Sequence, residues 1–129
     1  MRWQLALVCS LATSGCVSLR THDALTVRDV NSNLVGLHGK TIRVRGWLDR
    51  CQYYSCHLFA TKEGATNPSS SDDVLSIGAT EEFNEQALNR GPAEVIIVAR
   101  ANADCRTKYV CMDRAHELEP IAIRFLGKK

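Results

Sequence analysis

The chain has 129 residues, of which 45% are hydrophobic and 23% charged, and its formal net charge is +2 at pH 7. This length suits one domain with a modest core, and the composition excludes an intrinsically disordered chain. A total charge so near zero gives little long-range attraction for nucleic acid or for anionic lipid.

The chain begins with Arg2 and an apolar run over residues 3–12, followed by small residues before Cys16. The run is too short to cross a bilayer as a stable helix. The layout resembles the signal of bacterial lipoproteins, in which the chain is cut before a cysteine that is then acylated. The resemblance implies a signal peptide at residues 1–15 and palmitate-type lipidation at Cys16. In such lipoproteins an aspartate after the acylated cysteine favours retention at the inner membrane. Val17 stands there instead, so the resemblance implies the periplasmic face of the cell outer membrane.

The same residues also fit an ordinary secretory signal cut nearby, or a buried N-terminal helix. In the lipoprotein interpretation, residues 16–36 are a lipidated spacer and a segment that docks on the domain formed by residues 37–129. The docking segment predicts a strand-like piece and one or two helical turns, with the apolar residues Leu25, Val27, Val30, Leu34 and Leu37. A turn at residues 38–40 follows, because glycine stands at its centre.

Residues 41–48 form the clearest predicted strand, since Ile42 and Val44 alternate there with other side chains at period two. Gly46 interrupts the apolar side, and a glycine inside a strand indicates a bulge, a bend or a close backbone approach. Residues 57–61 predict the returning strand. A long mobile connection is expected over residues 62–73 and a third strand over residues 74–79.

A helix is predicted after the third strand. Thr80 is its N-cap, and Glu81 and Glu82 occupy the first turn, where negative charge suits the helix dipole. Gly91 and Pro92 mark its end.

Two further strands complete the predicted order. Residues 93–101 are apolar on both faces and predict a central fourth strand. Residues 117–126 predict a fifth, in which Pro120 favours the edge of the sheet. The apolar side of this fifth strand is expected to carry Ile121, Ile123 and Phe125.

Three strands, a helix and two strands follow the order of the OB-fold, a five-stranded, partly open Greek-key barrel. Residues 39–48, GKTIRVRGWL, resemble the first strand of OB domains, especially the anticodon-binding domains of class II aminoacyl-tRNA synthetases. Small exported bacterial OB-fold proteins are the other relatives that the chain resembles. The resemblance implies a mainly β fold with one helix between strands 3 and 4. The synthetases have a base-stacking aromatic and an arginine at positions that fall on or near Cys56 and Ala60 here. Neither residue can stack on a base or pair with a phosphate, so the resemblance does not imply tRNA binding.

Four cysteines remain if Cys9 is removed with the signal and Cys16 is acylated, namely Cys51, Cys56, Cys105 and Cys111. An even number in two close pairs predicts two disulfides in an oxidising compartment. We expect each cysteine to pair with its near neighbour, which stabilises by on the order of 2 kcal/mol per bridge. A crossed pairing, a tetrathiolate zinc site and free thiols are the alternatives.

In OB-folds the ligand surface lies on strands 2 and 3, flanked by the loops that join strands 1–2 and 4–5. Both cysteine pairs fall in these two loops, and rigid loops lose less entropy on binding. Tyrosine adds flat apolar area with a polar tip, which suits a protein, peptide or glycan ligand. The expected ligand-binding residues are Tyr53, Tyr54, Arg106, Lys108 and Tyr109. Alternatively, the bridges only staple a small barrel, with the tyrosines packed on its ends.

Other classes of function find less support in the sequence. Arg43, Arg45 and Trp47 form a stripe on one face of the first strand, which is thin for a nucleic-acid groove and also fits a solvated sheet face. The histidines lack metal-site spacing, and no hydrolase, zinc-protease, phosphate-loop or dinucleotide motif occurs. We therefore expect a non-catalytic, lipid-anchored envelope binding module without cofactor or metal. Binding of single-stranded nucleic acid and a purely structural role in envelope assembly are the alternatives.

Overall fold

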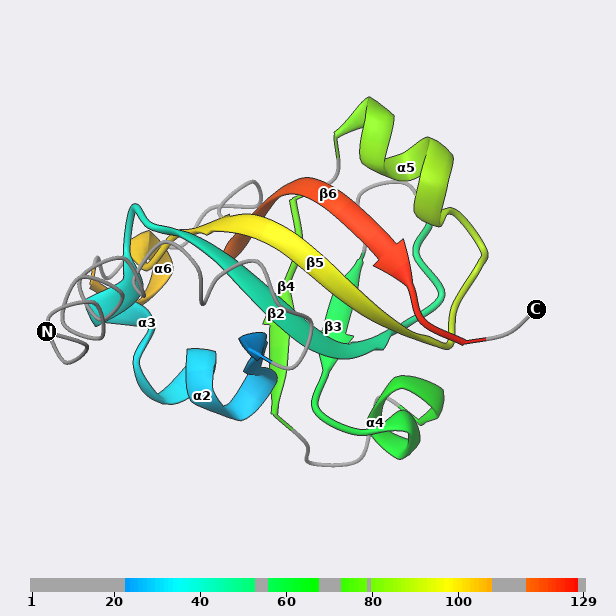
Figure 1. The fold of residues 1–129 in the computed structure, drawn as a ribbon, viewed down its shortest axis with the longest axis horizontal. Helices are drawn as coiled ribbons and strands as arrows, with labels where there is room; N and C mark the ends of the chain where they lie inside the picture. Colours follow the sequence, from blue (N-terminus) through cyan, green and yellow to red (C-terminus); the bar gives the residue numbers. More distant parts are fainter. Residues whose placement is uncertain (1–22, 53–55, 68–72, 79, 108–115, 128–129) are drawn as a thin grey trace, which may run out of the picture.

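The computed structural model describes residues 23–52, 56–67, 73–78, 80–107 and 116–127. One mainly antiparallel sheet dominates the fold, with the strand order β4-β3-β2-β5-β6 and a short β1 added parallel to β2 (Figure 1). The strands are β1 (Leu25–Thr26), β2 (Thr41–Leu48), β3 (His57–Phe59), β4 (Val74–Ser76), β5 (Ala93–Ala101) and β6 (Leu118–Phe125).

Short helices surround this sheet. They are α2 (Val27–Ser32), α3 (Leu34–Leu37), α4 (Lys62–Thr66), α5 (Glu81–Ala87) and α6 (Asp104–Thr107). In Figure 1, α2 and α4 lie below the long strands and α5 lies above them, beyond β6. No helix in the described part of the chain is both long and apolar enough to span a bilayer.

The sheet has six strands rather than the five expected, and it is not a closed barrel. Its outer strands meet at one isolated bridge, Ile77↔Leu118, beside which the Gly78 N–H donates to the Leu118 carbonyl at 2.8 Å. At the preceding residues, Ser76 and Glu117, the two strands are joined by hydrogen bonds between backbone N–H groups and side chains. The Ser76 N–H donates to Glu117 Oε1 at 3.0 Å, and the Glu117 N–H donates to Ser76 Oγ at 3.1 Å. Within the described residues, the two edges of the sheet are therefore joined at this seam by one backbone bridge and these side-chain hydrogen bonds.

The longest pairing in the sheet joins β2 to β5, and the bounds of both strands match those predicted. It runs without interruption from Thr41↔Arg100 to Leu48↔Ala93. Every second residue of both strands points into the core, as the period-two pattern of β2 predicts for that strand. These residues include Ile42, Val44, Leu48, Val95, Ile97 and Ala99. β5 is flanked by β2 and β6, so the predicted central position is confirmed.

The segment before the long strands completes the core. A capping box begins α2: the Asp29 N–H donates to Thr26 Oγ1 at 3.0 Å, and the Thr26 N–H donates to Asp29 Oδ2 at 3.2 Å. α2 and α3 then bury Val27, Val30 and Leu34 against the sheet. The prediction of a strand-like piece followed by helical turns is confirmed, and residues 25–37 share one core with the rest of the domain.

Two short helices begin at threonine caps. The Phe83 N–H donates to Thr80 Oγ1 at 3.1 Å, which confirms the predicted cap of α5. The expectation of a connection without regular structure over residues 62–73 is wrong at its start, where α4 forms. There the Gly64 N–H donates to Thr61 Oγ1 at 3.0 Å, and Ala65 is buried. A cap and one buried side chain are enough to order this turn.

β6 departs from its predicted pattern at a bulge. The register shifts between Val98 and Ala99, so that Val98 pairs with Ala122 and Ala99 pairs with Pro120. Ile123 and Phe125 pack against the core as expected. Ile121 is the extra residue of the bulge and is 62% exposed, so its predicted place on the apolar side is wrong.

Candidate functional site

The first cysteine loop is closed by the predicted disulfide. Cys51 and Cys56 are bonded to each other with 4.4 Å between their Cα atoms, and both are buried. Their backbones are tied to neighbouring elements, since the Asn89 N–H donates to the Cys51 carbonyl at 3.1 Å and the Ile77 N–H donates to the Cys56 carbonyl at 2.9 Å. The base of the loop is thus fixed at both ends. Tyr53 and Tyr54, predicted to contact a ligand, lie outside the described residues.

Asp49 organises the base of the same loop. Its Oδ1 accepts the His57 N–H at 3.0 Å, and its Oδ2 lies 3.1 Å from His57 Nδ1. Together with Cys51 and Cys56, Asp49 makes a group whose ligand-type atoms lie within 4.8 Å of one another. The two sulfur atoms are joined, so they cannot serve as the thiolate ligands that zinc requires. The group therefore has a structural role. A zinc site formed by all four cysteines is excluded, because Cys51 and Cys56 are bonded to each other.

The second cysteine loop begins at α6. Cys105 is also disulfide-bonded, and Cys111, its expected partner, lies outside the described residues, as do Lys108 and Tyr109. Because Cys51 and Cys56 are bonded to each other, a crossed pairing between the two loops is excluded.

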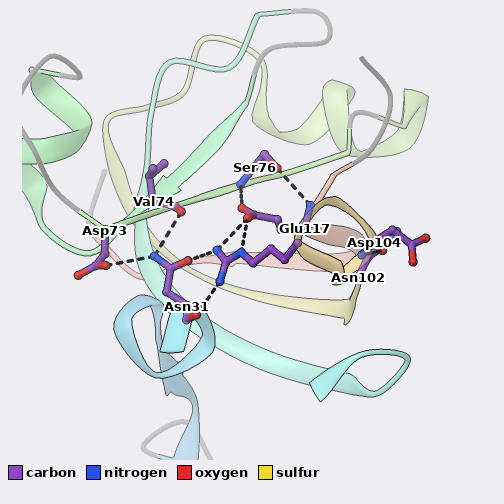
Figure 2. Close-up of polar contacts among 8 residues, drawn as sticks. Asn31, Asp73, Val74, Ser76, Asn102, Asp104 and Glu117 are labelled. Atoms are coloured by element: carbon purple, nitrogen blue, oxygen red, sulfur yellow. Dashed lines mark hydrogen bonds and ion pairs between the residues drawn. The ribbon is translucent and has the colours of Figure 1, made fainter. Parts of the chain in front are cut away.

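Arg106 lies in α6 and directs its guanidinium at the chain itself. Its Nε and Nη2 donate to Glu117 Oε2 at 3.2 and 2.8 Å, and its Nη1 donates to the Asn31 carbonyl at 2.6 Å. Nη2 also contacts Asn31 Oδ1, and Asn31 Nδ2 donates to Asp73 Oδ1 at 3.2 Å. Figure 2 shows Asn31, Ser76 and Glu117 converging on this point from α2, β4 and the approach to β6. Arg106 therefore ties α2 to the seam of the sheet, and its contact with a ligand stays a prediction.

The two cysteine loops lie at opposite ends of β5. Cys51 forms a bridge with Leu88, shortly before that strand begins, whereas Cys105 follows the end of the strand. In Figure 1, α6 accordingly lies at the left and the turn from β2 to β3 at the right. Nine residues of strand correspond to roughly 30 Å. The structure does not bring the loops together at their described ends, so a ligand touching both would have to run along the sheet.

A third surface lies on the outer side of β2, β5 and β6. We call it the arginine face, and its residues are Thr41, Arg43, Arg45, Ile96, Val98, Arg100, Ala122 and Arg124. A hollow of about 580 Å³ in this face is lined by Thr41, Arg43, Ile96, Val98, Ala122, Ile123 and Arg124. Ile96 is only 2% exposed although it lies outside the core cluster, because Arg45 and Arg124 flank it on the neighbouring strands.

The sequence identified only half of the cations on this face. Arg43 and Arg45 appeared there as a stripe, and the structure adds Arg100 from β5 and Arg124 from β6. Alternation along β5 could have placed Arg100 on the same side as Val98. Nothing in the sequence gives the register of β6, and its bulge reverses the simple alternation.

Trp47, the aromatic residue of the predicted stripe, is half-buried at the end of β2. Lys62 Nζ lies 5.8 Å from the centre of its ring, within the range of a cation–π contact. One face of the indole is thus occupied by a side chain of α4. This leaves the arginine face with a mainly aliphatic floor.

No protein-family model matches the chain, and no curated protein matches it. Among solved structures, it is similar to a "putative aspartyl-tRNA synthetase from Leishmania major Friedlin", with a TM-score of 0.49 and 12% identity over 82% of this chain. The chain spans about a fifth, 21%, of that protein. A likeness this weak carries no argument about function.

Proposed function

We propose that the chain is an exported, lipid-anchored OB-fold-like module of the bacterial envelope that acts by binding rather than by catalysis. The bonded pair Cys51–Cys56 carries this proposal, together with the disulfide-bonded Cys105. Stable disulfides are rare in the reducing cytosol and common in exported proteins. They agree with an N-terminus that resembles a lipoprotein signal and with acylation at Cys16 on the periplasmic face of the outer membrane.

The strand order supports the OB-fold part of this proposal. Along the chain, β2, β3 and β4 precede α5, and β5 and β6 follow it, which corresponds to the OB order of three strands, a helix and two strands. The bridge Ile77↔Leu118 joins the end of β4 to β6, the two outer strands in the sheet order β4-β3-β2-β5-β6, where an OB barrel would close. The two-residue β1 and helices α2 and α3 are additions at the N-terminal side.

A protein, peptide or glycan is the proposed ligand, held by the disulfide-closed loops. The rigid base of the first loop supports this role, because Cys51 and Cys56 are buried and hydrogen-bonded to α5 and β4 neighbours. A loop with fixed ends loses less conformational entropy when it binds. Tyr53 and Tyr54 would supply the contact area, and Tyr109 and Lys108 would extend it from the other end of the sheet.

Mass spectrometry of the membrane fraction tests the anchoring. We expect a mature N-terminus at Cys16 that carries acyl chains, with Cys51 joined to Cys56 and Cys105 to Cys111. The Cys16→Ser variant should lose the acyl mass and leave the membrane fraction. A native protein that is uncut, unacylated and fully reduced would overturn the proposal.

Alanine variants of the tyrosines test the binding site. In a strain that depends on the protein, Tyr53→Ala with Tyr54→Ala should impair envelope integrity while the melting temperature stays unchanged. Gln52→Ala is the matched control, because Gln52 is an exposed residue of the same loop and should leave the phenotype intact. If the tyrosine variants behave like this control, the first loop is only a staple. Cross-linking in cells to one dominant protein would instead indicate a structural role in assembly.

A further inference from the structure

The arginine face is arranged in rows across three strands. One row is Arg43–Val98–Ala122, and the next is Arg45–Ile96–Arg124, as the register of β2 with β5 and of β5 with β6 requires. Each row has an aliphatic centre with an arginine on at least one side. Arg43 and Arg124 lie on opposite sides of the hollow that they both line. The surface thus combines a shallow apolar floor with cationic walls.

Positive charge is in excess on this face. Among the described residues, the four arginines of the face lie beside two glutamates, Glu94 and Glu119, which occupy outward positions on β5 and β6. Arg45 Nε donates to Glu94 Oε2 at 2.9 Å, and Asn102 Nδ2 donates to Glu119 Oε2 at 2.9 Å. The excess equals the formal charge of the whole chain, +2. A guanidinium also presents several N–H donors in a planar fork that matches the geometry of phosphate.

The N-terminal chain enters the domain beside this face. β1 pairs with β2 through Leu25↔Val44 and Thr26↔Arg45, so the incoming chain passes next to Arg45. Six residues, or seven Cα-to-Cα steps, separate Cys16 from Asp23, the first described residue. They span at most roughly 25 Å when fully extended. An acylated Cys16 would therefore hold the domain close to the bilayer, with the arginine face near the point of attachment.

We propose that the arginine face lies on the anionic phospholipid headgroups of the membrane that anchors the protein, with lipid phosphates in the hollow between Arg43 and Arg124. This inference rests on the proposed lipid anchoring. Guanidinium groups bind phosphate through charge-assisted hydrogen bonds, and the aliphatic floor suits the glycerol backbone and upper acyl carbons. A single anchor holds a protein more firmly when a basic patch adds to it.

Vesicle binding by the full chain carrying Cys16→Ser tests the face without any contribution from acylation. The probes are vesicles of pure phosphatidylcholine and of an equimolar mixture with phosphatidylglycerol. We expect binding to the anionic vesicles to exceed binding to the neutral ones and to weaken with added salt. Arg43→Gln and Arg124→Gln should each lower partitioning about fivefold, and the double variant about 25-fold, as the usual contribution of one arginine near an anionic surface predicts.

Arg50→Gln is the matched control, because it removes the same charge from an exposed residue outside the face and should change partitioning far less. Ala122→Glu, an exposed position in the hollow, places a carboxylate there and should abolish the preference for anionic vesicles even if an arginine variant folds poorly.

Equal losses for Arg50→Gln and Arg124→Gln would overturn the inference. So would tighter binding to a single-stranded oligonucleotide, which would assign the face to nucleic acid. If Cys16 is found acylated but the vesicles are not bound, this inference alone is refuted. If the anionic vesicles are bound but Cys16 is not acylated, only the lipid anchor is refuted.

Discussion

Gly46 illustrates how one residue limits the packing of the sheet. A Cβ atom at this position would lie 2.7 Å from Val27 Cγ2, 2.8 Å from Leu58 Cγ and 2.9 Å from the Phe59 carbonyl oxygen. Helix α2 and strand β3 therefore approach β2 as closely as they do because this residue has no side chain. The close approach expected from a glycine inside a strand is confirmed.

We expect Gly46→Ala to lower the free energy of unfolding by about 1–3 kcal/mol, because the added methyl group overpacks a filled region. Urea unfolding followed by circular dichroism measures the change. Gly127→Ala is the control, since a Cβ there meets no atom within 4 Å. Identical unfolding midpoints for the two variants would show that the core yields easily at this point.

Other residues show where sequence reasoning stops. The sequence places Arg106 in a loop with tyrosines and a lysine and predicts a ligand contact, but it does not predict the contacts that Arg106 makes within the chain. Its partner Asn31 is 75 positions away in the chain, and no local pattern indicates that contact. Ile121 followed the alternation of its strand, but the bulge beside Val98 and Ala99 exposed it.

At the scale of elements, the N-terminal helices α2 and α3 contribute Val27, Val30 and Leu34 to the core. Adjacent residues of α3 have opposite environments: Leu34 is 1% exposed and Val35 is 60% exposed. This contrast provides a matched pair within one turn of helix.

Leu34→Ala should destabilise the protein by about 2–5 kcal/mol, because it removes buried methyl groups and leaves a cavity. Val35→Ala should change the stability by no more than about 0.5 kcal/mol, as is usual for exposed positions. Thermal unfolding of both variants checks the difference. Equal melting temperatures would mean that α3 packs only loosely on the sheet.

Long, strongly patterned elements could be predicted, but two of the short helices could not. β2 and β5 have a clear period or a continuous apolar run, and α5 has a cap and an acidic first turn. The two short helices that could not be predicted are α4, with five residues, and α6, with four. Elements this short have no periodicity of their own, and they form because tertiary contacts and single side-chain caps order them.

At the scale of the whole molecule, the Cys51–Cys56 bridge contributes to the stability of the fold. Replacing both cysteines by alanine should lower the free energy of unfolding by at least about 2 kcal/mol, since the unfolded chain regains the freedom of the open loop. Denaturant unfolding under oxidising conditions measures this loss, with Gln52→Ala as the control. An unchanged midpoint would show that backbone contacts alone, such as Asn89 to Cys51, hold the base of the loop.

The total charge of the chain conceals its distribution. A sum of +2 predicted little attraction for polyanions or anionic lipids. The register of three strands nevertheless gathers Arg43, Arg45, Arg100 and Arg124 on one side of the sheet. Strand register is a property of tertiary pairing, so this segregation becomes visible only when the fold is known.

The parallel pairing of β1 with β2 also bears on how the domain responds to mechanical tension. A pull arriving through the N-terminal segment acts along β1 and loads its bonds with β2 together, rather than unzipping them one after another. Directly behind β1, the buried Val27 and Val30 embed α2 in the core. A force that detaches this segment therefore has to expose Val27 and Val30 as well, so the core holds the N-terminal end of the described chain in addition to strand pairing.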